Sequence, residues 1–295
     1  MRFKNLILQT KKGIALVLCI GALPFVFSAS VYAENSARTD SVESKNSLYF
    51  DDYSKPVGLT YDVRAVINAN YLWRGMYCGG LNIQPSANVG YGGAYVEMWW
   101  NIGASDWKFQ KFVPELDISI GFSRWGLNVY LLYIHNFNCG FFDFHNYHDR
   151  GNRLEIDMLY TLSSKIPLTF RWATRVSAAD GYLDDAGQLK RAWSSYAELS
   201  YTQALPYDLS LYGAIGITPW RSCYTGYQRT FAVQNIELRL RKDWSLSEHC
   251  GMMIQGVLSI NPSALAADKH TAEWHPSDPS AQSVNANIAL GVYLK

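Results

Sequence analysis

The sequence predicts an all-β fold, a transmembrane antiparallel up-and-down β-barrel of about twelve strands with short periplasmic turns and longer extracellular loops. Three observations predict it. The first residues are typical of an export signal, apolar and polar residues alternate from residue 59 to the end, and the connectors are short and long in turn. Closed barrels, like helices, satisfy all their backbone hydrogen bonds within a membrane.

The first 33 residues have the layout of a secretory signal peptide. Arg2, Lys4, Lys11 and Lys12 form a basic start, an apolar run covers 13–27, and Val31-Tyr32-Ala33 resembles a cleavage site. This order of charge, apolar run and small residues is typical of an exported chain. We therefore predict a signal peptide over 1–33 with cleavage near Ala33, a polar periplasmic lead over 34–57, and a barrel over 58–295.

Composition narrows the class of the remaining chain. Residues 1–33 hold four of the 26 Lys and Arg and none of the 25 Asp and Glu, so the rest has a formal net charge of −3. That balance gives no reason to expect nucleic acid as a partner. The rest of the chain has no run of about 18 apolar residues, so no membrane-spanning helix is predicted there. Aromatic residues make up 15% of the chain. This content is typical of a transmembrane barrel, whose outward aromatic side chains form girdles at the two membrane interfaces.

Period-two alternation marks the strands. In the first segment Leu59, Tyr61 and Val63 share one face, and Asp62 and Arg64 share the other, because successive side chains of a strand point to opposite sides. Twelve such segments are predicted, at 59–73, 84–91, 94–104, 113–124, 127–137, 152–162, 167–177, 193–203, 208–218, 231–243, 250–260 and 283–295.

The connectors alternate in length. Tight turns are predicted at Gly92-Gly93, Trp125-Gly126, Ser163-Ser164 and Ala204-Leu205-Pro206. Long connectors are predicted at 74–83, 105–112, 138–151, 178–192, 219–230 and 261–282. A repeat accompanies them, since Glu115, Glu155, Glu198 and Glu237 lie in similar apolar frames, 40, 43 and 39 residues apart. One repeat is predicted to be one hairpin plus its outer loop.

Charged residues on the polar faces are the candidate lumen-lining residues, because Arg or Lys facing lipid costs about 2–4 kcal/mol at the membrane midplane. The set has eight carboxylates and five arginines, which predicts a mild preference for cations. The alternative is that they form a salt-bridged plug. The thirteen are Asp62, Arg64, Glu97, Glu115, Asp117, Glu155, Asp157, Arg171, Arg175, Glu198, Glu237, Arg239 and Arg241.

Two loops carry other chemistry-bearing residues. Asp143, His145 and His148 are of metal-ligating types, but a mobile loop favours an aromatic, hydrogen-bonding segment at the barrel mouth, and no metal is expected. His275 and Ser277 are a possible base and nucleophile of a lipid hydrolase. Tyr201-Thr202-Gln203 is similar to part of a barrel phospholipase motif whose remaining residues are absent. No catalytic residue and no cofactor are therefore predicted.

Four cysteines remain after the predicted cleavage. Cys78, Cys139 and Cys223 are expected in outer connectors, and Cys250 beside a short turn at the opposite rim. A hydrocarbon core of about 30 Å separates the rims, whereas a disulfide needs Cα atoms about 4.4–6.8 Å apart. Cys250 is therefore expected to stay unpaired. At most one bond is expected among the other three, and the alternative is four free thiols.

The segment Asn70-Tyr71-Leu72-Trp73-Arg74-Gly75, followed by Gln84-Pro85-Ser86 and 94–103, resembles the start of the TorF-like family of outer-membrane porins. The repeated Glu-Leu hairpins and the ending Gly-Val-Tyr-Leu are also similar. The chain departs from such barrels by ending on Tyr293-Leu294-Lys295 rather than on an aromatic residue. The resemblance covers most of the mature chain and implies a barrel and a pore, with no catalytic residues.

The expected function is passive diffusion of small polar solutes or ions across the outer membrane of a Gram-negative envelope. Expected partners are outer-membrane lipid, lipopolysaccharide and the barrel-insertion machinery. Two alternatives stay open: a barrel enzyme acting on lipids, and a structural or adhesive barrel with a plugged lumen.

Overall fold

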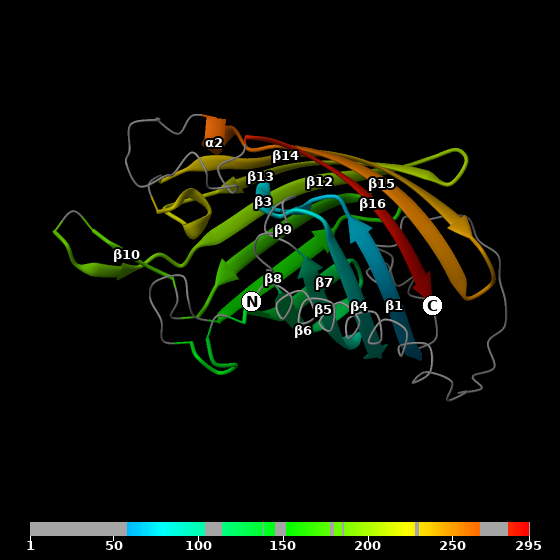
Figure 1. Ribbon diagram of the computed structural model, residues 1–295, viewed down its shortest axis with the longest axis horizontal. Coiled ribbons are helices and arrows are strands. Elements are labelled where there is room, and N and C mark those ends of the chain that lie inside the picture. Colours follow the sequence, from blue (N-terminus) through cyan, green and yellow to red (C-terminus); the bar gives the residue numbers. More distant parts are fainter. Residues whose placement is uncertain are drawn as a thin grey trace, which may run out of the picture. The chain divides into compact units, whose positions relative to one another are not determined.

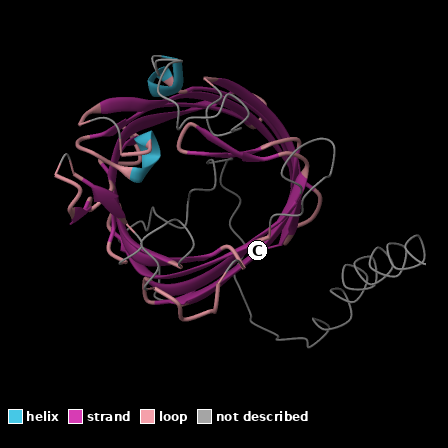
Figure 2. Cartoon of the chain, turned by 60° about the vertical axis from the view of Figure 1, so that its left-hand side comes forward, coloured by secondary structure: helices cyan, strands magenta, loops and turns pink. Residues whose placement is uncertain are grey.

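Twelve antiparallel strands close into a barrel in a computed structural model, which describes residues 58–103, 114–137, 139–144, 152–177, 180–184, 186–227, 230–265 and 283–294. The order around the barrel is β1-β16-β15-β14-β13-β12-β9-β8-β7-β6-β5-β4. Figure 1 shows the wall from the side, and Figure 2 shows the strands forming a ring. The predicted all-β barrel of twelve strands is confirmed.

The wall strands run for eight to fourteen residues, lengths that suit tilted membrane strands. They are β1 Leu59–Asn68, β4 Asn82–Tyr91, β5 Ala94–Gly103, β6 Glu115–Arg124, β7 Leu127–His135, β8 Arg153–Thr161, β9 Leu168–Arg175, β12 Ser195–Leu205, β13 Leu209–Thr218, β14 Ala232–Ser245, β15 Cys250–Ile260 and β16 Val284–Leu294.

Side-chain burial follows the alternation of the sequence. In β16 every second residue is buried from Asn285 to Tyr293, and the residues between them are exposed. Exposed positions carry large apolar side chains such as Ile288 and Leu290, whereas buried positions carry Asn285 and Asn287. The barrel therefore has an apolar exterior and a polar interior, the reverse of a water-soluble protein.

Short and long connectors gather at opposite ends of the barrel. The short-turn end holds the start of β1, the end of β16 and the turns after β4, β6, β8, β12 and β14. Two predicted turns are corrected. The connection after β8 covers 162–167, and the turn after β12 covers 206–208, where Tyr207 and Asp208 adopt positive φ. β12 thus continues through Leu205 before the chain reverses.

The prediction for the first strand was wrong at its end. β1 stops at Asn68, and the chain then forms a separate hairpin, β2 Tyr71–Trp73 and β3 Met76–Gly79. Its two-residue turn is Arg74-Gly75, with φ of 49° and 80°. Positive φ at both positions is typical of a type I′ hairpin turn. The strand predicted over 84–91 begins earlier, at Asn82.

Three smaller elements lie in the other long connectors. They are the hairpin of β10 Gly181–Leu183 and β11 Leu189–Arg191, the 3₁₀ turn η2 Cys223–Thr225, and the short helix α2 Pro262–Leu265. Among the described residues no helix has the length and apolarity needed to cross a membrane. The predicted signal peptide and polar lead lie outside the described residues.

The described cysteines are free thiols. Cys139 and Cys223 lie in long connectors and Cys250 opens β15 at the short-turn end, as predicted. Cys78 was predicted in an outer loop, and this was wrong. It lies on β3, in the hairpin that turns into the barrel.

Candidate functional site

The β2–β3 hairpin crosses the barrel interior. It joins the neighbouring strands β1 and β4, yet its side chains reach β6, two strands away, and β8, four strands away. The Tyr71 hydroxyl donates to Oε1 of Glu115 on β6 at 2.7 Å, and Arg74 at the tip reaches Glu155 and Asp157 on β8. The hairpin therefore occupies part of the barrel interior.

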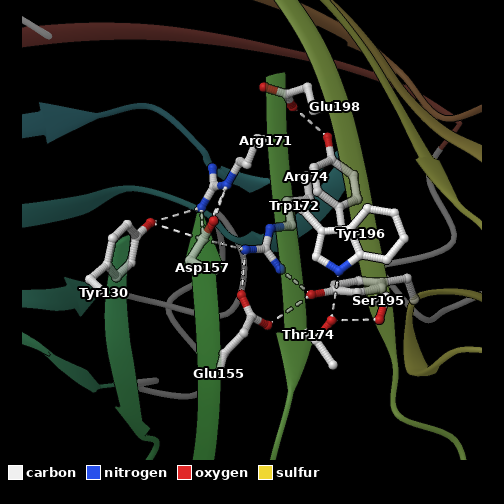
Figure 3. Close-up of polar contacts among 11 residues, drawn as sticks. Arg74, Tyr130, Glu155, Asp157, Arg171, Trp172, Thr174, Ser195, Tyr196 and Glu198 are labelled. Carbon is white, nitrogen blue, oxygen red and sulfur yellow. Dashed lines mark hydrogen bonds and ion pairs between the residues drawn. The ribbon is translucent and has the colours of Figure 1, made fainter. Parts of the chain in front are cut away.

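Arg74 is the centre of a buried ion-pair network, shown in Figure 3. Its guanidinium donates to Glu155, to Oδ2 of Asp157 at 3.0 Å and to the Tyr224 hydroxyl. The Tyr224 hydroxyl in turn donates to Oε2 of Glu155 at 3.1 Å. Arg74 is 6% exposed, Glu155 1% and Asp157 0%. Ion pairs so far from solvent are weakly screened, and removing one partner costs about 3–5 kcal/mol.

A second arginine completes the charge balance of the network. Arg171 on β9 binds both carboxylate oxygens of Asp157, with its Nε at 3.0 and 3.1 Å. Tyr130 on β7 donates to Oδ2 of Asp157 at 2.9 Å and accepts from Arg171 at 3.1 Å. Two arginines therefore face two carboxylates, and the network is neutral as a unit.

The electrostatics fix Arg74 in its charged form. Burial acts to lower the pKa of Arg74, but attraction to Glu155, Tyr224 and Asp157 together more than offsets it, so the pKa lies above its ordinary value. Aromatic rings add to this, since the Arg74 guanidinium lies 4.5 Å from the Trp73 ring centroid, 5.0 Å from Tyr196 and 5.5 Å from Tyr224. Such cation–π contacts favour the charged guanidinium.

Gly75 allows the hairpin tip to pack closely against β14. A Cβ added to Gly75 would overlap the backbone oxygen of Gln234, and the positive φ of Gly75 disfavours any other residue. Tyr71 at the base of the hairpin packs against Trp99 on β5 with ring centroids 5.5 Å apart. Backbone and side-chain contacts together hold the hairpin in one position.

The connector between β13 and β14 folds over the same network. Ser222 caps η2 by accepting from the Tyr224 N–H, and Tyr224 is 4% exposed. Tyr224 packs on Trp73 and Tyr196 with ring centroids 5.6 and 5.8 Å apart. Two connectors distant in sequence therefore meet on Arg74.

Six of the thirteen sequence-predicted site residues form pairs outside the Arg74 network. Asp62 binds Arg64 and Glu237 binds Arg239, each two residues apart on one strand. Glu198 accepts from the Tyr196 and Tyr212 hydroxyls at 2.5 and 2.8 Å. Arg241 pairs with Asp243, at 2.7 Å. Arg175 is 2% exposed, and its Nε has no hydrogen-bond partner among the described residues.

Five of the predicted residues form no ion pair in the described part of the chain: Arg175, Glu198 and three further carboxylates. Glu97 on β5 and Glu115 and Asp117 on β6 form no salt bridge within the described part of the chain. The two strands are neighbours, with Asp117 opposite Trp99 and Ser119 opposite Glu97. One side of the interior therefore carries three carboxylates without an arginine bound to them, which we call the acidic wall.

Several interior residues were missed by sequence reasoning. Arg153 precedes Glu155 on β8 by two positions, and Asp243 follows Arg241 on β14, so the same alternation places them inward. Arg74 lay just beyond the predicted strand. The Arg-Gly pair that forms its turn was the available signal, because Gly at such a position is typical of a hairpin turn.

The alternative chemistries find no site in the described residues. No group of three metal-ligating side chains occurs among them. His145, His148, His275 and Ser277 lie outside the described residues. Asp143 is described, and its backbone joins hydrogen bonds with Gly140 and Asn152.

Strand pairing and interior together define the class of this protein: a closed twelve-stranded antiparallel barrel with a polar interior crossed by a hairpin. No family model matches the chain, and no curated protein matches its sequence. Two solved structures are similar in fold. The NanC porin shares 12% identity over 80% of this chain and 100% of its own, with a TM-score of 0.45. A porin refined at 1.8 Å shares 12% identity over 72% of this chain and 61% of its own, with a TM-score of 0.30.

Proposed function

We propose that this chain is a porin-like channel of the outer membrane, through which small polar solutes or ions diffuse passively. The observation that carries the proposal is a closed barrel whose interior is lined by charged and polar side chains while its exterior is apolar. Twelve strands lie between barrels filled by their own side chains and barrels with wide aqueous channels. The width of the open lumen therefore depends on how much of the interior the hairpin fills.

The exterior supports a membrane location. Exposed aromatic residues occur near the short-turn end, among them Tyr91, Trp125, Tyr160 and Trp244, and again near the long connectors, among them Phe137 and Phe231. Exposed aliphatic residues such as Leu131, Ile156, Leu199 and Leu238 lie along the strands between these ends. Two aromatic girdles around an apolar band are typical of outer-membrane barrels.

The interior supports a path with a bias toward cations. The Arg74 network is neutral, and most other arginines are paired with a carboxylate on their own strand. The acidic wall and Glu198 form no salt bridge in the described part of the chain, and neither do the inward arginines Arg153 and Arg175, so unpaired carboxylates outnumber unpaired arginines by four to two. Carboxylates lining a pore favour cations, so we propose a mild cation preference in which Glu97, Glu115 and Asp117 are the determining residues.

One observation favours a second candidate, a barrel whose lumen is plugged. Arg74, Glu155 and Asp157 are almost fully buried, and the hairpin that bears Arg74 packs on both sides of the interior. If the hairpin blocks the lumen completely, the protein is a structural barrel, or a channel that opens only when the hairpin moves.

Single-channel recording in planar bilayers separates these proposals. Steady ohmic steps from the wild-type protein support the channel. A silent wild type together with a conducting Arg74→Gln variant supports a plugged barrel that the hairpin closes. Silence of both supports a structural role.

The proposed partners follow from the location. The aromatic girdle near the long connectors is suited to lipopolysaccharide, and the last strand is the proposed contact of the barrel-insertion machinery. Tyr293 is 7% exposed and points inward, so Leu294 is the outward residue at the end of β16.

A further inference from the structure

A pocket at the long-connector rim lies apart from the Arg74 network. Its volume is about 420 Å³ and its lining comes from two connectors, β9 to β12 and β13 to β14. Sites for small ligands commonly occupy about 300–1,000 Å³, so the pocket is large enough for one. It is lined by Tyr182, Asp184, Ala192, Trp220, Arg221 and Thr230.

The walls of the pocket are held by buried hydrogen bonds. Asp180 is 0% exposed and accepts from the Ser194 backbone at 2.6 Å and the Ser194 hydroxyl at 2.5 Å. It also accepts from the Tyr227 hydroxyl at 3.3 Å, which joins the two connectors. Tyr227 stacks on Tyr182 with ring centroids 6.0 Å apart. A preformed pocket loses little conformational entropy when it binds a ligand.

Arg221 supplies a positive charge that no described residue pairs with. Its guanidinium lies 4.8 Å from the Tyr182 ring centroid, but within the described residues it forms no salt bridge and no hydrogen bond. By contrast, Arg74 and Arg171 are each bound to carboxylates. A free, planar guanidinium is suited to bidentate binding of a carboxylate or phosphate.

Trp220 and Asp184 further restrict which ligands the pocket can bind. Trp220 is 39% exposed and is fixed by a hydrogen bond from its Nε1 to the Trp193 oxygen at 3.0 Å. Its ring packs against Trp172 with centroids 5.7 Å apart and also lines the pocket, where an aromatic side chain suits the C–H groups of a sugar ring. The Asp184 carboxylate accepts from the backbone N–H groups of Ala186 and Gln188, and the latter bond is the main cause that lowers its pKa. Lys190 lies 3.7 Å from Asp184 Oδ2 and partly offsets its charge, but the carboxylate oxygens can still accept hydrogen bonds from ligand hydroxyl groups.

We propose that this pocket binds an anionic saccharide, with Arg221 on its acidic group, Trp220 beneath its ring and Asp184 on its hydroxyls. The proposal does not require that the barrel conducts. Two sources present this chemistry at the rim, a free sugar acid in solution and the saccharide headgroup of lipopolysaccharide.

The test uses the full-length barrel refolded in detergent free of lipopolysaccharide, titrated with glucuronate while tryptophan fluorescence is followed. Saturable binding of glucuronate is expected. Glucose and acetate should each bind at least about tenfold more weakly. Arg221→Gln should weaken glucuronate binding about tenfold or more, as expected for loss of a charge-assisted pair. Arg124→Gln is the matched control, because Arg124 also lies over an aromatic ring, Trp125, but at the short-turn end.

The outcomes separate the sources and can overturn the proposal. Competition by lipopolysaccharide added to the detergent identifies the headgroup as the ligand, and lack of competition identifies the free sugar acid. A heat-dependent gel shift equal to that of the wild type verifies that the Arg221→Gln barrel is folded. Equal binding of glucose and glucuronate, or wild-type affinity in a folded Arg221→Gln barrel, overturns the proposal.

Discussion

Arg74 joins parts of the chain that are far apart in sequence. It lies in the connector after β1, yet its partners are on β8, β12 and the connector after β13. Because Glu155 and Asp157 are buried, their charges depend on the two arginines that bind them. Arg74 therefore helps to fix the position of the hairpin, together with the contacts of Tyr71 and Gly75.

Arg74→Gln should release the hairpin and widen the lumen. The substitution leaves one uncompensated carboxylate in the network, at a cost of about 3–5 kcal/mol. A shift of 3 kcal/mol changes the docking equilibrium by roughly a hundredfold. We expect a higher single-channel conductance and a stronger cation preference. Arg239→Gln is the control, because it removes the same charge from strand β14 of the barrel without touching the hairpin. Equal effects of the two substitutions would contradict this role.

Gly75→Ala tests the same docking through the backbone. The added Cβ would overlap the Gln234 backbone oxygen, and an L-residue at the φ of Gly75 costs about 1–2 kcal/mol more than glycine. The hairpin should leave its site while the charges stay intact. We expect a higher conductance with unchanged reversal potential. Gly187→Ala, at a positive φ with open space around its Cβ, is the matched control and should conduct as the wild type does. A wild-type conductance for Gly75→Ala would show that the hairpin does not limit the path.

At the scale of the element, the hairpin also protects a thiol. Cys78 on β3 and Cys250 at the start of β15 are both free, but Cys78 lies inside the barrel and Cys250 at its rim. A bulky maleimide should therefore label Cys250 faster than Cys78 in the folded protein, as read by mass spectrometry of digested samples. Arg74→Gln should speed the labelling of Cys78 alone. Equal rates for both thiols in the wild type would contradict the docked hairpin.

The wall strands were predictable from the sequence because burial in a barrel has a period of two. The glutamates at 115, 155, 198 and 237 all lie on inward positions of strands that run toward the short-turn end. The β2–β3 hairpin was not predictable by the same means. Tyr71 and Trp73 continue the alternation of β1, so periodicity alone gives no sign that the chain leaves the wall at Asn68.

Contacts between residues far apart in sequence explain why the alternation of residues did not predict the β2–β3 hairpin. Asn70 is held by Asn287 and Ala286 of β16, about two hundred residues away, and this anchors the chain where it turns inward. The partners of Arg74 are equally remote in sequence. Such contacts depend on the closure of the barrel, which no local pattern encodes.

At the scale of the whole molecule, the acidic wall should set selectivity. Glu115→Gln with Asp117→Asn removes two carboxylates that form no salt bridge with an arginine in the described residues. The reversal potential in a salt gradient should move toward zero or toward anion preference. Asp208→Asn is the control, because it removes one charge at the exposed short-turn end. A clear anion preference in the wild type would contradict the proposed role of the wall.

The central claim is that the barrel provides a path for solutes across a membrane, narrowed by the β2–β3 hairpin. Single-channel conductance of the wild type beside Arg74→Gln tests it most directly, in the same bilayer and the same salt. We expect steady ohmic steps from the wild type and larger steps from the variant. No conductance from either protein, when both are folded by the heat-dependent gel shift, would contradict it.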